Sequence, residues 1–382
     1  MQKIYYVGNY SGKECKYRKP TNENYAGTMK MKFIIEELKK LGYFVEVVSL
    51  AVDRSIVKAR EERIRIDDKE EHYFVPYHGI NILGHVRATG ANAVKSLYSY
   101  LYNTVQEGDV VIVYHAYAYS KEMDKLKQKK GIRLIKQIEE VYCLSHYDVL
   151  DKSKLATEEQ MFVNSDAYLM INEGLARKYA NGKPYAVSYG NYLVYNERDI
   201  NMTGDIGIVY TGLISRDRGA FSSIESMKYL PDNYSLHILG FGNDEDMVKM
   251  RELMSEINDK SERVFFYGTK TGDEYTEFLS HHQLGLCIMD TKDEIAENAF
   301  PSKILAYLGN SLLVVASKSK CIVKSKVSEH MIYCDDNEPE KIAQAILSIP
   351  KKIYHNPSKL LKELEEDFRK ELQNVIMEVQ RK

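Results

Sequence analysis

The stretch that decides the fold reads NAFPSKILAYLGNSLLVVAS and covers residues 298–317. Residues 312–316 are five apolar residues in a row, the pattern of a strand that a parallel sheet buries on both faces. Before them, apolar residues recur at helical spacing behind Pro301, and proline is favoured in the first turn of a helix. The stretch therefore predicts a helix followed by a buried parallel strand, which is the repeating unit of an α/β sheet.

The same alternation of strand and helix extends along the chain on both sides of this stretch. Apolar runs predict strands at 3–7, 44–50, 109–114, 132–135, 167–171 and 185–188, and then at 206–211, 235–239, 263–267, 284–288 and 312–316. The charge-dense segment 58–71 fits least well, and we expect a solvated helix or loop there. Residues 195–205 are polar and lack periodicity, as a linker does. We therefore predict an α/β protein with Rossmann-like, doubly wound domains at 1–195 and 196–357 that face a central cleft.

Composition excludes several classes of protein. The chain has 382 residues, of which 44% are apolar and 28% charged, and its net charge is −2. This profile predicts a globular protein with a large core and no nucleic-acid partner. The five cysteines are widely spaced without a Cys-x-x-Cys pair, which argues against disulfides and structural zinc. The N-terminus lacks the pattern of a secretory signal, and no apolar run approaches the roughly 20 residues that span a bilayer, so we expect a cytoplasmic protein.

The helix predicted after Pro301 begins with Ser302 and Lys303 at the carboxyl edge of a sheet. The N–H groups of a helix start attract anions, and a lysine adds a full positive charge. This pattern predicts a phosphate site. An ordinary capped helix that packs on its strand would show the same residues.

Four stretches resemble, in order and spacing, the motifs of retaining glycosyltransferases of the GT-B fold, in the large family four. They read IVYTGLISRDRGAF (208–221), SLHILGFGND (235–244), RVFFYGTKTGDEYTEFLSHHQLGLCIM (263–289) and FPSKILAYLGNSLLVVAS (300–317). The last resembles the donor-site motif with Pro-Ser-Lys, and Gly27 lies where the family has a glycine turn. The resemblance covers most of the chain and is strongest over 206–317. It also implies that the final amphipathic helix, at 358–382, packs back on the first domain.

The resemblance implies a set of residues that bind a nucleotide-diphosphate sugar. Arg218, or Arg216 in a shifted loop register, corresponds to the basic residue that contacts the diphosphate, and Lys303 is the second such residue. A forked, permanently charged guanidinium suits phosphate oxygens. The implied donor-binding residues are Gly27, Gly212, Arg216, Arg218, Gly240, Thr269, Lys270, Glu297, Asn298, Pro301, Ser302 and Lys303.

The chain departs from the family at the Glu-x7-Glu pair, whose second glutamate usually bonds the ribose. Alignment on Pro-Ser-Lys places Asn298 at the first position, with Glu297 beside it, and Ala306 at the second. Alanine accepts no hydrogen bond, so the ribose must be recognised differently. Ser311 also replaces a customary glycine. These changes motivate an alternative, a non-catalytic glycosyltransferase-like accessory subunit; a nucleotide-sugar epimerase or sensor on the same fold is the third hypothesis.

Two residues of the N-terminal half are the candidate catalytic residues. His115 follows the strand at 109–114 and is placed to bond a donor-sugar hydroxyl or a phosphate. A partly buried histidine held by a backbone carbonyl is the alternative interpretation. Glu140 follows the strand-like segment 132–138, where relatives carry an acidic residue. The alternative interpretation is that Glu139 and Glu140 are a pair of acids at a helix N-terminus that complement the helix dipole.

The leading hypothesis is a retaining, hexosyltransferase-type enzyme. Its partners would be a nucleotide sugar and a glycan, a polyprenyl-linked or a glycoprotein acceptor, because bacterial relatives act in polysaccharide biosynthesis, some in peripheral contact with the inner face of the membrane. We expect no cofactor and no metal. Asp244-Glu245-Asp246 resembles a metal motif but stands at a predicted helix start, where acids are favoured. The sequence leaves the sugar, the nucleotide and the oligomeric state open.

Overall fold

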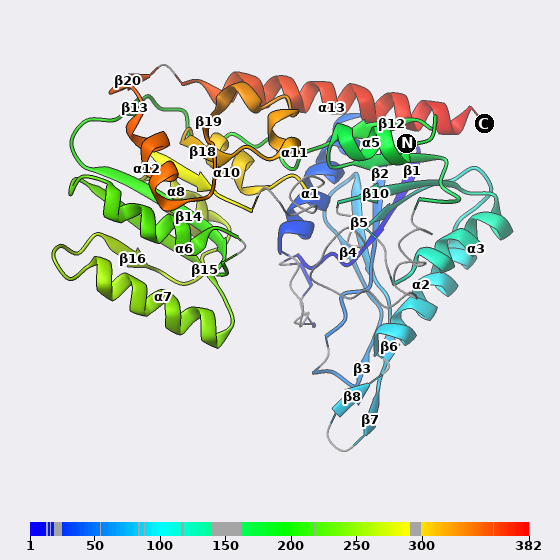
Figure 1. The fold of residues 1–382 in the computed structure, drawn as a ribbon. Helices are drawn as coiled ribbons and strands as arrows, with labels where there is room; N and C mark the ends of the chain where they lie inside the picture. The colour runs from blue at the N-terminus through cyan, green and yellow to red at the C-terminus, as the bar shows by residue number, and fades with distance from the viewer. Residues whose placement is uncertain are drawn as a thin grey trace. The chain divides into compact units, whose positions relative to one another are not determined.

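The computed structural model describes residues 1–382 except 13, 16, 19–24, 54, 83–84, 88, 116–117, 140–161, 217, 291–298, 354 and 382. The chain divides into two compact units, each built on one large sheet (Figure 1). Unit 1 comprises Met1–Asn191 and Asp367–Lys382, and unit 2 comprises Tyr192–Glu366.

The main sheet of unit 1 has eight strands in the order β12-β11-β10-β9-β1-β2-β5-β4. All neighbours pair in parallel except β4 and β5. The six strands that the apolar runs predict in this half are confirmed. The bounds are β1 Lys3–Gly8, β2 Phe44–Ser49, β4 Glu62–Arg65, β5 Glu70–Phe74, β9 Val110–Tyr114, β10 Arg133–Ile138, β11 Ala167–Met170 and β12 Tyr185–Val187.

The expectation of a helix or loop at 58–71 is wrong, because most of this segment is in strands. Strand β4 pairs antiparallel with β5, and Arg63 on β4 forms an ion pair with Glu71 on β5. Opposite charges across two strands stabilise an exposed edge, so the charges support a strand here. Three smaller strand pairs complete the two units: β3 Lys58–Ala59 with β6 Tyr77–His78, β7 Ile80–Ile82 with β8 His85–Arg87, and β13 Ile200–Asn201 with β20 Lys352–Ile353.

Helices cover both faces of the sheet in unit 1. One face packs against α2 Thr89–Thr104 and α3 Ser120–Lys130. Unit 1 also contains α1 Tyr25–Lys40, α5 Glu173–Tyr179 and the second half of α13 Pro357–Gln380. Helix α13 packs on α1, since the rings of Phe33 and Phe368 lie 5.5 Å apart and Arg369 donates to Glu37 at 2.6 Å.

Unit 2 contains a fully parallel sheet of six strands in the order β16-β15-β14-β17-β18-β19. The five predicted strands of this half are confirmed, and β19 is an addition that the sequence did not predict. The bounds are β14 Ile206–Leu213, β15 Tyr234–Phe241, β16 Val264–Phe266, β17 Leu284–Cys287, β18 Leu313–Ser317 and β19 Met331–Cys334. Parallel strands place all their carboxyl ends at one edge, where α/β proteins bind ligands.

The helices of unit 2 also cover both faces. Side chains of α6 Ala220–Glu225, α7 Asp244–Ile257 and α12 Pro339–Leu347 pack in one core with β14. Helices α8 Asp273–Ser280 and α10 Lys303–Gly309 reach Thr211 of β14, whose side chain points to the opposite face. Short turns of helix lie at α11 Lys320–Val323, η2 Ser226–Tyr229 and η3 Ser328–His330.

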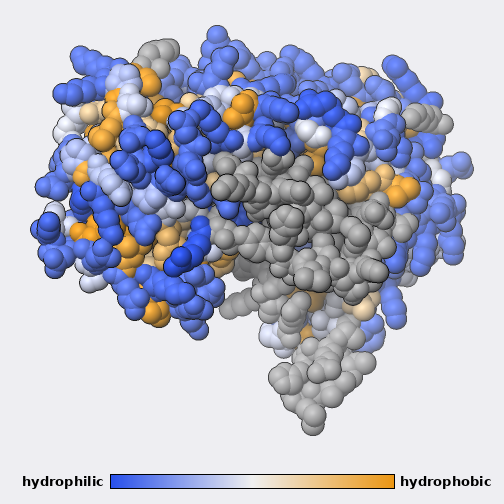
Figure 2. Space-filling model, in the orientation of Figure 1, coloured by the Kyte–Doolittle hydropathy of each residue, from blue (hydrophilic) through white to orange (hydrophobic). Residues whose placement is uncertain are grey.

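Hydrophilic side chains form most of the surface visible in Figure 2, with smaller apolar patches between them. Within the described residues, no helix is long and apolar enough to span a membrane.

Candidate functional site

The carboxyl ends of β14 and β15 in unit 2 are built from glycines. Gly212 has a φ of 139° and lies opposite Gly240 in the parallel register. A Cβ on Gly240 would stand 2.0 Å from the carbonyl oxygen of Gly212, so no other residue fits there without a shift of the backbone. Gly219 ends the following loop with a φ of 74° and lies against Ile288. The glycines therefore let the two strand ends and the following loop pack closely against each other and against Ile288.

Lys303 places its ammonium group over this glycine edge. Its Nζ lies 3.1 Å from where a Cβ on Gly212 would be and 4.4 Å from the centre of the Tyr210 ring. Burial lowers the pKa of Lys303, and the positive charge of Arg218 lowers it further. No carboxylate of the described residues contributes to that pKa shift. A cation that is destabilised by desolvation and by another positive charge is stabilised when an anion binds next to it.

The loop after β14 carries both candidate arginines, and both side chains are exposed. Tyr210 anchors this loop, because its hydroxyl lies 2.9 Å from the carbonyl oxygens of Leu213 and Arg218. Arg216 lies over the ring of Phe221, 5.7 Å from its centre. The positive charge of Arg218 contributes to lowering the pKa of Lys303, so the loop after β14 and helix α10 interact electrostatically.

The helix that carries Lys303 begins later than the sequence predicts. Helix α10 starts at Lys303 itself, so Pro301 precedes the cap and does not occupy the first turn. Ser302 is the cap residue, but its side chain makes no capping hydrogen bond. The reason is that Ser302 already has helical dihedral angles, with φ −57° and ψ −23°, whereas a capping side chain needs extended backbone. The Ile304 N–H donates to the Pro301 carbonyl at 3.1 Å and forms a tight first turn.

A cluster of three hydroxyl groups lies where α8 and α10 meet β14, and no sequence pattern predicted it. Thr211 Oγ1 on β14 is 3.0 Å from Tyr307 Oη on α10 and 3.2 Å from Tyr275 Oη on α8. The Thr211 N–H also donates to Tyr307 Oη at 3.0 Å. The sequence feature related to this cluster is Gly285, a glycine inside the apolar strand β17. A Cβ at this position would stand 2.4 Å from the Tyr307 ring, so the glycine makes room for the tyrosine.

Thr269 and Lys270 follow the edge strand β16. The loop is attached to the glycine edge, because the Gly240 N–H donates to the Gly268 carbonyl at 2.8 Å. Thr269 is exposed, and Lys270 Nζ lies 5.8 Å from the centre of the Phe278 ring. Both residues are therefore near Gly240, although Lys270 is directed toward an aromatic ring.

In unit 1, His115 follows β9 at the carboxyl edge of the other sheet. Its Nδ1 accepts a hydrogen bond from the Glu139 main-chain N–H at 3.2 Å. A main-chain N–H only donates, so the neutral ring carries its hydrogen on Nε2. Glu139 in turn accepts from Lys30 at 2.6 Å and from Gln137 at 2.5 Å. The sequence named the neighbouring Glu140, which lies outside the described residues.

The remaining predicted donor-binding residues to be placed are Gly27, Glu297 and Asn298. Gly27 lies inside the first turn of α1, so the expectation of a glycine turn there is wrong; Gly27 is absent from the glycines with positive φ. The helix forms over this glycine because it begins at Tyr25, earlier than the apolar spacing indicates. Glu297 and Asn298 lie outside the described residues.

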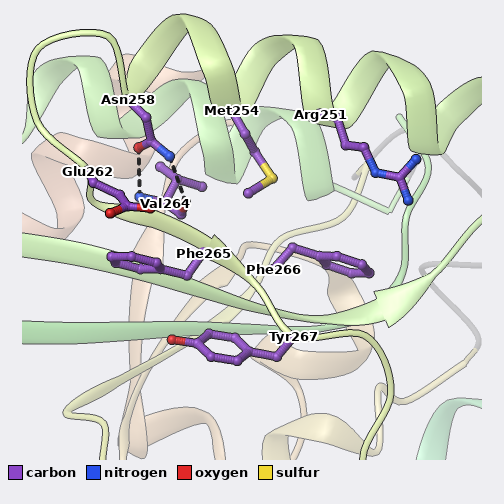
Figure 3. A pocket seen from close by; sticks show the side chains of 8 residues that line it. All are labelled: Arg251, Met254, Asn258, Glu262, Val264, Phe265, Phe266 and Tyr267. Carbon is purple, nitrogen blue, oxygen red and sulfur yellow. Dashed lines mark hydrogen bonds between the residues drawn. The ribbon is translucent and has the colours of Figure 1, made fainter.

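A shallow groove with a volume of about 350 Å³ lies elsewhere in unit 2, between α7 and the edge strand β16 (Figure 3). Asn258 closes one end, because its side chain bonds both main-chain groups of Val264. Arg251 and Glu262 are its charged residues, and aromatic rings form its floor. The groove contains none of the glycine, lysine or hydroxyl groups described above. Across the described part of the chain, no group of three or more metal-binding side chains is present.

Solved structures resemble the whole chain, whereas no family model and no curated protein sequence matches it. Sucrose-phosphate synthase from Thermosynechococcus elongatus superposes with a TM-score of 0.67 at 14% identity, over 98% of this chain and 95% of that one. Trehalose-6-phosphate synthase from E. coli, bound with UDP-2-fluoro glucose, gives a TM-score of 0.68 at 9% identity, over 99% of both chains. Anabaena HepE, in complex with UDP and glucose, gives 0.67 at 12% identity, over 98% and 99%. The fold is therefore GT-B, with two Rossmann-like domains.

Proposed function

We propose that this chain is a glycosyltransferase that transfers a sugar from a nucleotide-diphosphate sugar to an acceptor, with retention of configuration. The observation that carries the proposal is the Lys303 ammonium over Gly212, at the carboxyl edge of the unit 2 sheet. Two of the structural neighbours are complexes with UDP or a UDP-sugar analogue, which makes UDP-sugars the first donors to test.

The chemistry of sugar transfer explains why these groups are suited to the role. When the bond between the sugar and the diphosphate breaks, negative charge develops on the leaving diphosphate. Fixed positive groups in a water-poor site stabilise that charge most in the transition state. Burial lowers the pKa of Lys303, and an anion beside it would favour the charged form.

The remaining roles are proposals that follow the resemblance. His115 and Glu140 are the proposed catalytic residues, and His115 would act through its Nε2–H as a hydrogen-bond donor to a sugar hydroxyl or phosphate. The acceptor is a glycan, a polyprenyl-linked or a protein-linked group, met in the cytoplasm or at the inner face of the membrane. The reaction as proposed uses neither a metal nor another cofactor.

Ala306 supports a second candidate function, a subunit that binds a nucleotide sugar without transferring it. The residue lies on α10, one turn after Lys303, and offers no hydrogen-bond acceptor where the resemblance expects glutamate. An accessory subunit would bind the donor and leave it intact, whereas an epimerase would convert the free nucleotide sugar without an acceptor.

A transfer assay separates these functions. The full-length protein is incubated with a panel of UDP-, GDP- and TDP-sugars and an acceptor mixture, and released nucleoside diphosphate is measured. We expect release from at least one donor and, by NMR, a product with the anomeric configuration of that donor. Lys303→Ala should abolish release, while Lys228→Ala, which removes an exposed lysine of unit 2 paired with Glu256, should keep most of it. An inverted product would refute retention, and binding without release would favour the accessory subunit.

A further inference from the structure

A chain of hydroxyl groups in unit 2 ends at Tyr275, on the carboxyl edge of the sheet. Tyr307 is buried and accepts the Thr211 N–H, while its Oη lies 3.0 Å from Thr211 Oγ1 and 3.4 Å from the Leu286 carbonyl oxygen. Thr211 Oγ1 lies 3.2 Å from Tyr275 Oη. Tyr307 and Thr211 thus connect the backbone of two strands to Tyr275.

The directions of the hydrogen bonds among these three hydroxyl groups determine which hydrogen or lone pair has no partner within the chain of hydroxyls. If Tyr307 donates to Thr211 and Thr211 donates to Tyr275, the Tyr275 hydrogen is left over. If Tyr275 donates to Thr211, Thr211 to Tyr307 and Tyr307 to the Leu286 carbonyl, the lone pairs of Tyr275 are left over. In both arrangements the open position is on Tyr275, which is only half-buried. Because each hydroxyl in the chain can rotate, Tyr275 can present either a donor or an acceptor.

The hydroxyl chain and the proposed phosphate site share helix α10. Lys303 and Tyr307 are four residues apart on this helix, so their side chains project from the same side of it. A phosphate oxygen only accepts hydrogen bonds, and the Lys303 ammonium is a donor that suits it. A sugar hydroxyl both donates and accepts, and Tyr275 can form either kind of bond with it. Burial raises the pKa of Tyr275 to about 12, so the phenol stays protonated at neutral pH and the chain stays intact.

We infer that Tyr275 binds a hydroxyl group of the nucleotide-sugar ligand and thereby selects ligands that carry this hydroxyl beside the diphosphate. The inference rests on the proposed function, because it takes the nucleotide sugar as the ligand of Lys303. The hydroxyl belongs to the ribose or to the transferred sugar. The two sources share one chemistry, and ligands that lack one of them tell them apart.

Calorimetric titration of the full-length protein tests the inference. UDP, 2′,3′-dideoxy-UDP, UDP-glucose and pyrophosphate are titrated into wild type, Tyr275→Phe and Lys303→Ala. Tyr234→Phe is the matched control, because Tyr234 begins β15 at the opposite edge of the same sheet. If Tyr275→Phe does not fold, Thr211→Val removes the hydroxyl that orients Tyr275 and carries the same expectation.

We expect Tyr275→Phe to weaken binding of hydroxyl-bearing ligands by about three- to tenfold, the effect of one hydrogen bond, and to leave pyrophosphate unchanged. If Tyr275→Phe loses affinity for UDP but not for dideoxy-UDP, Tyr275 binds a ribose hydroxyl. If it loses affinity for UDP-glucose alone, Tyr275 binds a hydroxyl of the transferred sugar. Lys303→Ala should weaken UDP and pyrophosphate alike.

Two results overturn the inference and leave the proposed function intact: unchanged affinity for every ligand, or a loss that pyrophosphate shares. Wild-type protein that binds no nucleotide at all would overturn the proposed function, and the inference with it.

Discussion

Ser311 has a φ of 60°, in the left-handed region where glycine is favoured and where the resemblance expects glycine. Its hydroxyl donates to the Asn196 carbonyl at 2.7 Å, so the serine combines backbone strain with a stabilising bond. Serine in this conformation costs roughly 1–2 kcal/mol, and a hydrogen bond contributes about 0.5–1.5 kcal/mol. The two contributions are therefore of similar size and opposite sign.

This balance predicts different effects of two substitutions at position 311. Ser311→Gly loses the bond but relieves the strain, so its free energy of unfolding should stay within about 1 kcal/mol of wild type. Ser311→Ala keeps the strain and loses the bond, so it should be less stable by about 1 kcal/mol. Urea unfolding of the three proteins measures both effects. An alanine variant as stable as wild type would show that the bond to Asn196 contributes nothing.

At the scale of secondary-structure elements, His237 on β15 and His282 after α8 lie edge to face, 4.5 Å apart. The pKa of His282 is lowered to about 4, chiefly by burial and to a smaller extent by the neighbouring charges of His237, His281 and Arg198. The unfolded chain therefore binds a proton on this histidine between about pH 4 and its ordinary pKa of about 6.5, while the folded chain does not. Stability from this group is complete above about pH 6.5 and is lost as the pH falls.

We expect this histidine to account for about 3 kcal/mol of the free energy of unfolding lost between pH 6.5 and 4, at 1.36 kcal/mol per pKa unit. His282→Asn keeps a donor for the Phe278 carbonyl, which His282 Nδ1 contacts at 2.8 Å, and does not titrate. Its stability should therefore fall less steeply with acid. If the free energy of unfolding, measured in urea, falls with pH equally in wild type and variant, the claim that His282 is buried and neutral is contradicted.

Helix α13 forms ion pairs with other segments of the chain in different surroundings. Arg369 donates to Glu37 of α1, whose side chain is fully buried, whereas Lys362 and Glu197 are both more than half exposed. Breaking a buried pair leaves an uncompensated charge and costs about 3–5 kcal/mol, although Lys40 also contacts Glu37 at 2.7 Å and reduces the cost. An exposed pair contributes roughly 0–1 kcal/mol.

Arg369→Met should therefore destabilise the protein by about 2 kcal/mol or more, and Lys362→Met by less than about 1 kcal/mol. Thermal or urea unfolding of the two variants gives the comparison. Equal effects would mean that Glu37 finds full compensation elsewhere when Arg369 is removed.

The sequence predicted the elements well where one residue pattern determines them. Unbroken apolar runs such as 312–316 identified the buried parallel strands, because only a strand covered on both faces needs them. The search for apolar runs missed the strands within 58–71, where cross-strand ion pairs replace apolar residues. The sequence also misplaced the start of helix α1, which begins two residues before Gly27. Helix starts were misplaced for a similar reason: Pro301 favours a first turn, but the backbone of Ser302 and Lys303 decides where that turn lies.

The candidate site was predicted only in its charged part. Lys303 and Arg218 stand out in sequence because the resemblance places both at positions that contact the diphosphate. Tyr275 and Tyr307 do not stand out, since a tyrosine at helical spacing looks like any core residue. Their meeting at Thr211 depends on three elements that are far apart in sequence, which a local pattern does not reveal.

For the molecule as a whole, the absence of a metal requirement is a prediction. The proposed site uses Lys303 and Arg218 to hold the diphosphate, so a divalent cation has no necessary role. Exhaustive dialysis against EDTA should leave nucleotide binding and donor turnover unchanged, with a metal-dependent glycosyltransferase as the positive control for chelation. Activity lost with EDTA and restored by Mn²⁺ or Mg²⁺ would contradict this part of the account.

The most direct test of the central claim is to compare UDP with uridine as ligands of wild-type protein, Lys303→Ala and Arg218→Ala by calorimetry. If Lys303 and Arg218 hold the diphosphate, each substitution removes a charge-assisted hydrogen bond and should weaken UDP binding by about 1.5–3 kcal/mol. Binding of uridine, which has no phosphate, should be unchanged within about 0.5 kcal/mol. Equal losses for both ligands, or none for either, would contradict the assignment of the diphosphate to Lys303 and Arg218.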